Sequence, residues 1–359
     1  MRIVLGLCAV AGVAALAATD APGRGAASAT PARGSATIGL TASRFGKGAA
    51  ESRPAKIVVA NANGSGSRVL TTGWSSYVSP DGSRVAVLDG DVNYTNLRLE
   101  LYASSGGAPT RTIDIACGGM VWSPDSTRLA CVDYGDDPAK PWRLLLIDPA
   151  SGVTTTLVTG FFDSHVSFSP DSSRLAYVQK TTGRKYLDPR ARLRVVDLAT
   201  RRATTVHVGA ALSPTWGPDA IAFGILKPLG RNYLSNVAVV QPGGSGYRQV
   251  TRFRPTAELF GPTPVAWSSD GKRLLAGMEG QDAWTQRESY AVDPLRGSMR
   301  LIAHEVSPSA LSRDGRYVIG QTGDAESTSL AGSNVVRVPW GGGQKRVLLR
   351  QAVEPSFNG

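Results

Sequence analysis

Short runs of apolar residues, separated by turn sequences, fill most of the chain and recur at a regular spacing. The clearest recurrent unit is an apolar anchor, a turn of the Ser-Pro-Asp-Gly type and a second apolar run. Its six copies are 44, 46, 48, 51 and 44 residues apart, with anchors at Val78, Trp122, Phe168, Trp216, Trp267 and Leu311. This spacing predicts one four-stranded β-unit per repeat.

Each copy predicts a β-hairpin. Proline suits the second position of a type I turn, and serine, aspartate and glycine suit the others. A β-branched or aliphatic run follows the turn at once, as in a second strand. An arginine recurs where that strand starts, and we interpret it as architectural rather than catalytic: Arg84, Arg128, Arg174, Arg273 and Arg316.

A second type of hairpin lies between these units, and the chain holds seven copies of it against six complete copies of the first type. The missing strands are at the two ends. The segment SATIGLTAS, from Ser35, reads as a second strand, and VEPSFNG at the C-terminus reads as a first strand. Pairing of the two ends would complete a seventh unit and remove exposed sheet edges. A six-unit ring with loose ends is the alternative.

The segments WSPDSTRLACV, FSPDSSRLAYV and VVQPGGSGYRQVT resemble the WD40-like (PD40-type) repeats of the TolB-like β-propellers. The resemblance covers residues 36–359. It implies an all-β fold, a single β-propeller of seven four-stranded blades (six as the alternative), closed by its N- and C-terminal strands.

The N-terminal region predicts export. Residues 1–18 have a positive charge at Arg2, an apolar stretch and a small-residue cleavage site, as in a signal peptide. The stretch is shorter than the roughly 20 residues of a spanning helix, so we expect cleavage rather than retention as an anchor. Residues 19–35 are rich in Ala, Gly and Pro and predict a flexible linker. We therefore expect an extracellular or periplasmic protein, monomeric, with no transmembrane segment after cleavage.

The formal net charge is +11, with 39 Lys and Arg against 28 Asp and Glu. The basic residues are spread along the chain, which argues against a nucleic-acid-binding domain. A protein or an anionic polymer of the cell envelope is the partner that this charge favours.

Long loops between the second and third strands of a blade would surround one mouth of the central channel, and function concentrates in such loops. The loop from Gln179 to Arg192 is the most basic of them. With two tryptophans from other loops it predicts a ligand-binding surface, formed by Trp142, Arg184, Lys185, Tyr186, Arg190, Arg192 and Trp284. The alternative is a solvated loop whose tyrosine packs on its own blade.

The candidate metal ligands are scattered. His165, His207 and His304 lie 3, 9 and 7 residues before their anchors, so we expect no shared metal site, and His165 is the one candidate ligand. Oligogalacturonate lyases, which this chain also resembles in fold, use a histidine-lined metal site. Asp89, Asp91, Asn93 and Glu100 have the spacing of an EF-hand loop, but Tyr94 replaces its glycine, which indicates a turn.

Cys117 and Cys131 flank one Ser-Pro-Asp-Ser turn at nearly equal distances, so they should face each other across the hairpin. Export to an oxidising compartment then predicts a disulfide between them.

No nucleophile elbow or phosphate-binding loop occurs, and we expect no cofactor. The sequence favours a binding or scaffold module rather than an enzyme. It would recognise a protein or an anionic envelope component through its loop face. The alternative is a metal-dependent lyase or hydrolase that acts on acidic oligosaccharides.

Overall fold

A computed structural model describes residues 38–44, 54–91, 96–135, 140–182, 187–230, 232–255, 259–280, 287–323 and 333–358 of the chain. The predicted signal peptide (1–18) and linker (19–35) lie outside the described residues.

All regular elements of the described residues are β-strands, in six antiparallel sheets. The first sheet holds β27 (Ala352–Phe357), β1 (Leu40–Arg44), β2 (Ala55–Ala60) and β3 (Arg68–Gly73). The second holds β4 (Ser75–Val78), β5 (Arg84–Asp89), β6 (Arg98–Ala103) and β7 (Arg111–Ile113). A seven-stranded sheet follows, with β8 (Cys117–Trp122), β9 (Leu129–Asp133), β10 (Trp142–Ile147), β11 (Thr154–Phe168), β12 (Arg174–Lys180), β13 (Arg192–Asp197) and β14 (Ala203–Val208).

The remaining three sheets have four strands each. They are formed by β15 (Ala211–Trp216), β16 (Ile221–Leu229), β17 (Asn232–Val240) and β18 (Arg248–Gln249); by β19 (Leu259–Trp267), β20 (Leu274–Gly280), β21 (Arg287–Val292) and β22 (Met299–His304); and by β23 (Ser307–Leu311), β24 (Tyr317–Thr322), β25 (Asn334–Pro339) and β26 (Arg346–Arg350).

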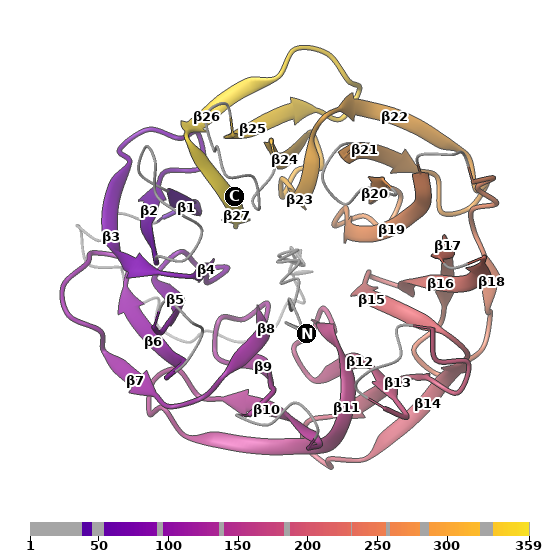
Figure 1. Ribbon diagram of the computed structural model, residues 1–359, viewed down its shortest axis with the longest axis horizontal. Helices are drawn as coiled ribbons and strands as arrows, with labels where there is room; N and C mark the ends of the chain where they lie inside the picture. Colours follow the sequence, from indigo (N-terminus) through magenta and orange to yellow (C-terminus); the bar gives the residue numbers. More distant parts are fainter. Residues whose placement is uncertain are drawn as a thin grey trace, which may run out of the picture.

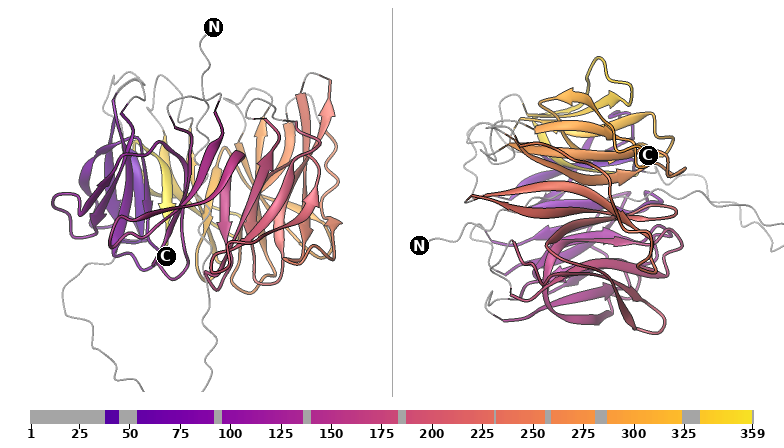
Figure 2. Two further views of the ribbon diagram at one scale, coloured as in Figure 1. Left: turned by 90° about the horizontal axis from the view of Figure 1, so that it is seen from below. Right: turned by 90° about the vertical axis from the view of Figure 1, so that its right-hand side faces the viewer.

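The sheets surround a central axis like the blades of a propeller (Figure 1). Strands β4, β8, β15, β19, β23 and β27 and the second part of β11 lie nearest the axis, and β3, β7, β14, β18, β22 and β26 lie at the rim. Seen edge-on, the ring is a disc with loops on its two faces (Figure 2). The prediction of an all-β propeller is confirmed.

The two ends of the chain meet in one sheet, where β1 lies between β27 and β2. Leu40 pairs with Phe357 and Arg44 with Ala352. The C-terminal strand also bonds the second sheet, because Ser356 Oγ accepts a 3.1 Å hydrogen bond from the Val78 amide. The Asn358 side chain donates to the carbonyls of Ile38 (2.9 Å) and Ser79 (2.8 Å).

The turns of the Ser-Pro-Asp type share one network. In the turn at Ser79, the serine hydroxyl donates to Asp81 at 2.6 Å and accepts from the Arg84 amide at 3.0 Å. Asp81 also accepts from the Ser83 amide at 3.0 Å. The turns that start at Ser123, Ser169, Ser268 and Ser312 repeat the serine–aspartate bond at 2.5–2.7 Å.

The turns also connect neighbouring repeats. Ser126 has a φ of 61°, a conformation that favours glycine, and its hydroxyl accepts from the Asp81 amide of the preceding turn. Ser172 has a φ of 60°, and its hydroxyl accepts from the Asp125 amide. The side chain therefore explains why serine replaces glycine in these two turns.

The recurring arginines reach across to the next repeat. Arg128 and Arg273 donate to the carbonyls of Ser172 (3.3 Å) and Gly315 (2.8 Å). The Arg174 guanidinium lies 5.2 Å from the ring centroid of Trp216. These contacts support the architectural interpretation for these three arginines.

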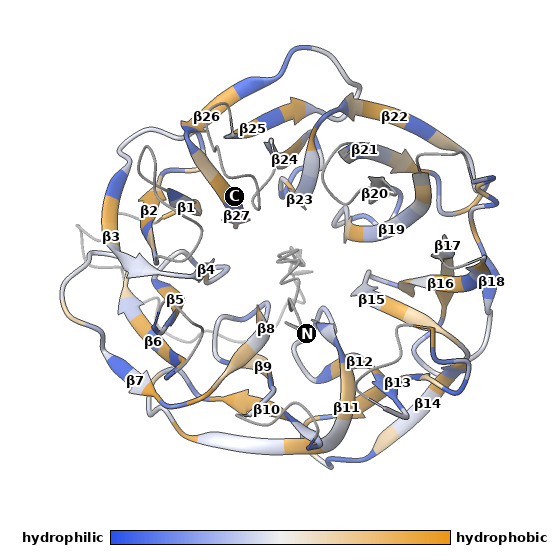
Figure 3. Cartoon of the chain, viewed as in Figure 1, coloured by the Kyte–Doolittle hydropathy of each residue, from blue (hydrophilic) through white to orange (hydrophobic). Residues whose placement is uncertain are grey.

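The apolar core lies between neighbouring sheets. One cluster joins Leu88 and Leu99 of the second sheet to Trp122 and Leu129 of the next. The anchor tryptophans add polar bonds at these boundaries: Trp122 Nε1 donates to the Tyr77 carbonyl at 3.0 Å. Figure 3 shows apolar strand segments, in orange, around the whole ring.

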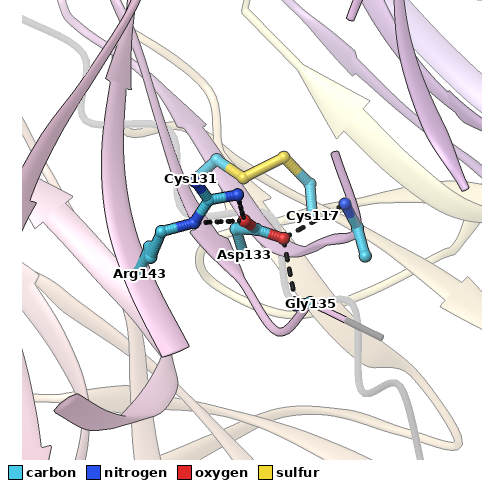
Figure 4. Close-up of a disulfide and its surroundings, with 6 residues drawn as sticks. Cys117, Cys131, Asp133, Gly135 and Arg143 are labelled. Atoms are coloured by element: carbon cyan, nitrogen blue, oxygen red, sulfur yellow. Dashed lines mark hydrogen bonds and ion pairs between the residues drawn. A yellow bond between two sulfur atoms is a disulfide. The ribbon is translucent and has the colours of Figure 1, made fainter. Parts of the chain in front are cut away.

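The disulfide between Cys117 and Cys131 is present, with a Cα–Cα distance of 5.6 Å (Figure 4). The two cysteines are not directly opposed in the hairpin, so the expectation from their positions was wrong on this point. Cys131 pairs with Met120, and Cys117 pairs with Asp133, because the register shifts between Cys117 and Gly119. A β-bulge, rather than direct opposition, therefore brings the two cysteines together.

We expect the protein to contain no free thiol at Cys117 or Cys131, as measured by alkylation and mass spectrometry. Because the bridge closes a loop of 14 residues, the double serine variant should lose about 3 kcal/mol of unfolding free energy. Denaturant titration of the oxidised protein and of the variant measures this loss. Alkylation of both cysteines in protein from the exported fraction would contradict the prediction.

Candidate functional site

The candidate site lies on the face opposite the Ser-Pro-Asp turns. Those turns join each innermost strand to the second strand, so the second strand ends on the other face. Lys180 is the last residue of β12 and pairs with Phe161 of β11. The predicted basic loop began at Gln179, but the structure assigns Gln179 and Lys180 to β12, so the loop itself starts at Thr181. Three residues of β11 and one of β15 complete a polar group here.

We call Asp163, Ser164, His165, Lys180 and Ser213 the Asp163 cluster. His165 Nδ1 lies 3.2 Å from Asp163 Oδ2 and 3.3 Å from the hydroxyl oxygens of Ser164 and Ser213. The Ser213 amide donates to Asp163 Oδ2 at 2.9 Å. Lys180 Nζ lies 3.7 Å from Asp163 Oδ1. One carboxylate thus connects an imidazole, an ammonium group and the neighbouring innermost strand.

Asp163 is ionised at neutral pH. Burial raises the pKa of its carboxyl, but the hydrogen bond and charge of His165, the charge of Lys180 and the Ser213 amide together lower this pKa to about 2. The carboxylate therefore persists at any physiological pH.

Ser213 has a left-handed backbone, with φ at 48°. It lies in a bulge where the β15–β16 register shifts between Leu212 and Thr215. Such a conformation costs free energy in residues other than glycine and is enriched at functional sites. Serine at this position keeps a hydroxyl beside His165, which glycine would not supply.

Two glycines of β8 let this region pack closely. A Cβ on Gly119 would lie 1.8 Å from the Ser164 carbonyl oxygen, and one on Gly118 would lie 1.6 Å from the Tyr134 ring. Burial raises the pKa of the Tyr134 hydroxyl, and the Asp163 charge raises it further, so the phenol stays neutral. The disulfide is attached to the same strand through Cys117.

A buried aspartate anchors the basic loop. Asp188 is 2% exposed, and Oδ2 accepts from the amide and hydroxyl of Thr181 at 2.5 and 2.7 Å. Its Oδ1 accepts from the Arg190 amide at 3.0 Å. The two described ends of the loop are thereby joined, and Arg190 and Arg192 are exposed beside them.

The other predicted binding residues divide into two groups. Trp142 is half-buried and packs edge-to-face on Tyr134 and Phe161, with ring centroids 4.5 and 5.6 Å away. Much of its ring is therefore used in packing. The remaining four lie outside the described residues: Arg184, Lys185, Tyr186 and Trp284.

The three histidines do not converge. His207 stacks on Tyr247 at the rim with centroids 4.8 Å apart, and burial lowers its pKa. His304, on β22, lies 2.7 Å from Glu288. Across the described ranges, no three His, Cys, Asp or Glu side chains form a group that could hold a metal ion.

The acidic side chains with EF-hand spacing form ion pairs and hydrogen bonds with neighbouring side chains. Arg98 pairs with Asp89 at 2.5 Å and with Glu100 at 3.0 Å, and Asp91 accepts from Asn96. Asn93 and Tyr94 lie outside the described residues.

Of these residues the sequence indicated only His165, and Asp163, Lys180 and Ser213 were not predicted. The Asp-x-His spacing on one strand was a local signal for the first of these. Ser213 lies 50 residues from Asp163 and reaches it only because the two innermost strands are neighbours.

The geometry limits the chemistry of the cluster. Asp163 and Ser213 approach the same nitrogen of His165, whereas a nucleophilic Ser-His-Asp triad needs them on opposite nitrogens. An Asp-held imidazole beside an ammonium group is suited to binding an anion or to moving a proton.

Fold and site together define a β-propeller with a polar cluster at the innermost strands of one face. No family model and no curated protein matches the sequence. Solved structures share the fold. TolB from Acinetobacter baumannii has a TM-score of 0.54 and 16% identity, covering 77% of this chain and 66% of TolB, just under two thirds of its length.

An oligogalacturonate lyase in complex with manganese has a TM-score of 0.56 and 18% identity, with 87% of this chain and 85% of the lyase covered. The β-propeller domain of the Trilobed protease from Pyrococcus furiosus has a TM-score of 0.52 and 14% identity, with 77% and 84% covered. The chain therefore has the TolB-like propeller fold. No helix within the described part of the chain is long and apolar enough to cross a membrane.

Proposed function

We propose that the chain is an exported seven-bladed propeller that binds a protein or an anionic component of the cell envelope through its loop face. Strand sharing supports this count of blades. The first part of β11 pairs with β10 and its second part with β12, so the seven-stranded sheet counts as two blades. The pairing of β1 with β27 supports closure of the ring by the terminal strands.

The observation that carries the binding role is the anchored basic loop. Asp188 fixes both described ends of this loop, and exposed arginines follow directly. A loop that is held in place loses less conformational entropy on binding than a free one. The loop adjoins the Asp163 cluster through Lys180, so cationic groups extend from the loop towards the central axis. The disulfide suits an oxidising compartment outside the cytoplasm.

Charge reversal tests this role. Replacing Arg184, Lys185, Arg190 and Arg192 by glutamate should weaken retention on immobilised polygalacturonate, or on an envelope extract, about 100-fold. Four charges at roughly 0.7 kcal/mol each account for this loss. Attraction between exposed charges is screened over about 8 Å at physiological salt, so retention should also fall as salt rises.

The matched control carries the same substitution at Arg201 and Arg202, which are exposed in the turn at the other end of β13. This control should bind like the natural sequence, and both variants should keep its melting temperature. Equal retention of the four-residue variant and the natural sequence would overturn the binding role.

A metal-dependent lyase or hydrolase that acts on acidic oligosaccharides is the second candidate. The held imidazole of His165 beside Lys180 favours it, because such a pair could accept a proton next to a bound carboxylate. This candidate predicts unsaturated or shortened products from oligogalacturonate, lost with a chelator and in His165→Ala. Salt-sensitive retention without product supports the binding role instead.

A further inference from the structure

We infer that the outer turns of the last three sheets bind the surface of an anionic lipid bilayer. These turns join β17 to β18, β21 to β22 and β25 to β26, on successive sheets of the ring (Figure 1). They lie on the face of the Ser-Pro-Asp turns. The Trp340 amide, for example, donates to the carbonyl of Arg316, which directly follows such a turn, at 2.7 Å. The inference goes beyond the proposed function, which concerns the opposite face.

Each of the three turns carries a bulky apolar or aromatic side chain. Leu295 is 83% exposed, more than any other large apolar residue in the described ranges. Tyr247 is 48% exposed, although it stacks on His207. Trp340 is half-buried. A single exposed apolar residue is common on protein surfaces, but three of them on successive turns need a cause.

An earlier turn of the chain shows that the fold does not require the leucine. In the turn from β10 to β11, Asp148 Oδ1 accepts a hydrogen bond from the Ala150 amide at 2.8 Å. In the turn from β21 to β22, Asp293 Oδ1 accepts the same bond from the Leu295 amide at 2.9 Å. The two turns share one structure, so an exposed alanine suffices where Leu295 is found.

The other two turns also have counterparts with small residues. Tyr247 occupies the position of Ser67 in the turn from β2 to β3, where the same two backbone hydrogen bonds recur at 2.8 and 2.9 Å. Trp340 occupies the position of Ser104 in the turn from β6 to β7, and both amides donate to a carbonyl beside a Ser-Pro-Asp turn, at 2.7 and 2.8 Å. The bulky side chains are therefore a property of one sector of the ring and not of the turn type.

The same sector is rich in positive charge. Residues 241–248, 293–300 and 339–346 contain five basic residues and one acidic residue, Asp293. The five are Arg248, Arg296, Arg300, Lys345 and Arg346, and all are exposed. Arg248 donates to the Leu295 carbonyl at 3.2 Å, and Arg300 donates to the Trp340 carbonyl at 2.7 Å. These partners are neutral, so the arginines hold the turns in place and keep their charge.

A lipid surface fits this arrangement better than a protein does. The apolar side chains stand on separate turns, whereas a folded partner would bury one contiguous apolar patch. Tyrosine and tryptophan favour the headgroup region of a bilayer, and exposed leucine and arginine add apolar burial and attraction to anionic lipids. Binding in this way directs the Ser-Pro-Asp face towards the bilayer and leaves the loop face accessible to its own ligand.

Co-sedimentation with lipid vesicles tests the inference. We expect the protein to bind vesicles of phosphatidylglycerol and phosphatidylcholine in equal parts, and to bind pure phosphatidylcholine much more weakly. The triple variant Tyr247→Ser, Leu295→Ala and Arg296→Ser installs the residues of the matching turns, so it should keep the natural melting temperature. Its binding to the anionic vesicles should fall about 20-fold, because it lacks two apolar contacts and one cation.

Two controls locate the effect. Val69→Ser combined with Val153→Ser removes two exposed apolar side chains (50% and 62%) from the part of the ring with small turn residues, and should bind like the natural sequence. The four-glutamate variant of the basic loop should also keep vesicle binding at physiological salt, because its charges lie on the other face and are screened. All these proteins have the same N-terminus, so any effect of residues 1–18 on lipid binding is equal in them.

Fluorescence quenching by brominated lipids shows which turn meets the bilayer. Leu295→Trp should increase the quenched fraction, whereas Ala150→Trp, at the matching position, should not. Equal vesicle binding by the triple variant and the natural sequence, or equal quenching at the two positions, overturns the inference. Vesicle binding that is lost only in the basic-loop variant would also overturn it and would leave the proposed function intact. Absence of vesicle binding, with loss of a protein partner in the triple variant, would assign these turns to a protein instead.

Discussion

Removal of residues 352–359 should abolish cooperative unfolding of the protein or cause it to aggregate. The deletion takes away β27, which pairs with β1 and contributes the buried side chains of Val353 and Phe357. It also removes the bonds of Ser356 to Val78 and of Asn358 to Ile38 and Ser79. The innermost edge of the first sheet would be left unpaired, and an unpaired edge is a template for association with other chains.

Calorimetry and light scattering of the purified variant measure the effect. Asn358→Ala serves as the control, because it removes two hydrogen bonds and leaves the strand in place. We expect that control to melt cooperatively, destabilised by about 1–3 kcal/mol. If the deletion variant melts like the full chain, the ring is not closed by its terminal strands, and the six-bladed alternative gains support.

Gly119→Ala should destabilise the protein by about 3 kcal/mol and disturb the Asp163 cluster. The new Cβ would lie 1.8 Å from the carbonyl oxygen of Ser164, a backbone atom that cannot rotate away. Overpacking of this kind costs about 1–3 kcal/mol. Since Ser164 lies between Asp163 and His165, a shift of β11 would also move the groups that hold the imidazole.

Denaturant titration gives the loss of stability, and the imidazole NMR signal of His165 reports the change in the cluster. Gly243→Ala is the matched control, because nothing lies within 4 Å of its added Cβ. That variant should be as stable as the natural sequence. A stable Gly119→Ala protein with an unchanged His165 signal would show that β8 does not support the cluster.

The local features of this fold could be predicted from the sequence because residues close in the chain determine them. A Ser-Pro-Asp turn forms hydrogen bonds among its own residues, as between Ser79 and Asp81. The hairpins and their spacing can therefore be recognised in the sequence. The disulfide was predictable for the same reason, since its cysteines flank one such turn. The bulge that aligns them was not, because Gly119, at the shift in register, packs against Ser164 of β11, which is distant in the sequence.

The candidate site depends on contacts between distant parts of the chain. Sequence indicated a basic loop and one histidine near a blade junction. It gave no sign that Asp188 anchors that loop, because an aspartate in a basic segment looks like any solvated residue. The αL conformation of Ser213 has no signal in the sequence either, since glycine is the residue expected there.

The sequence by itself determined the repeat, the all-β class and the pair of cysteines, because each follows from contacts within one hairpin. Only the tertiary structure decided that Asp163, His165, Lys180 and Ser213 share one site. Three of them lie on two strands of one sheet, and the fourth lies on the neighbouring innermost strand. The ring places these strands side by side, and the bulge at Ser213 turns its amide towards Asp163. Neither effect is encoded in a short segment of the chain.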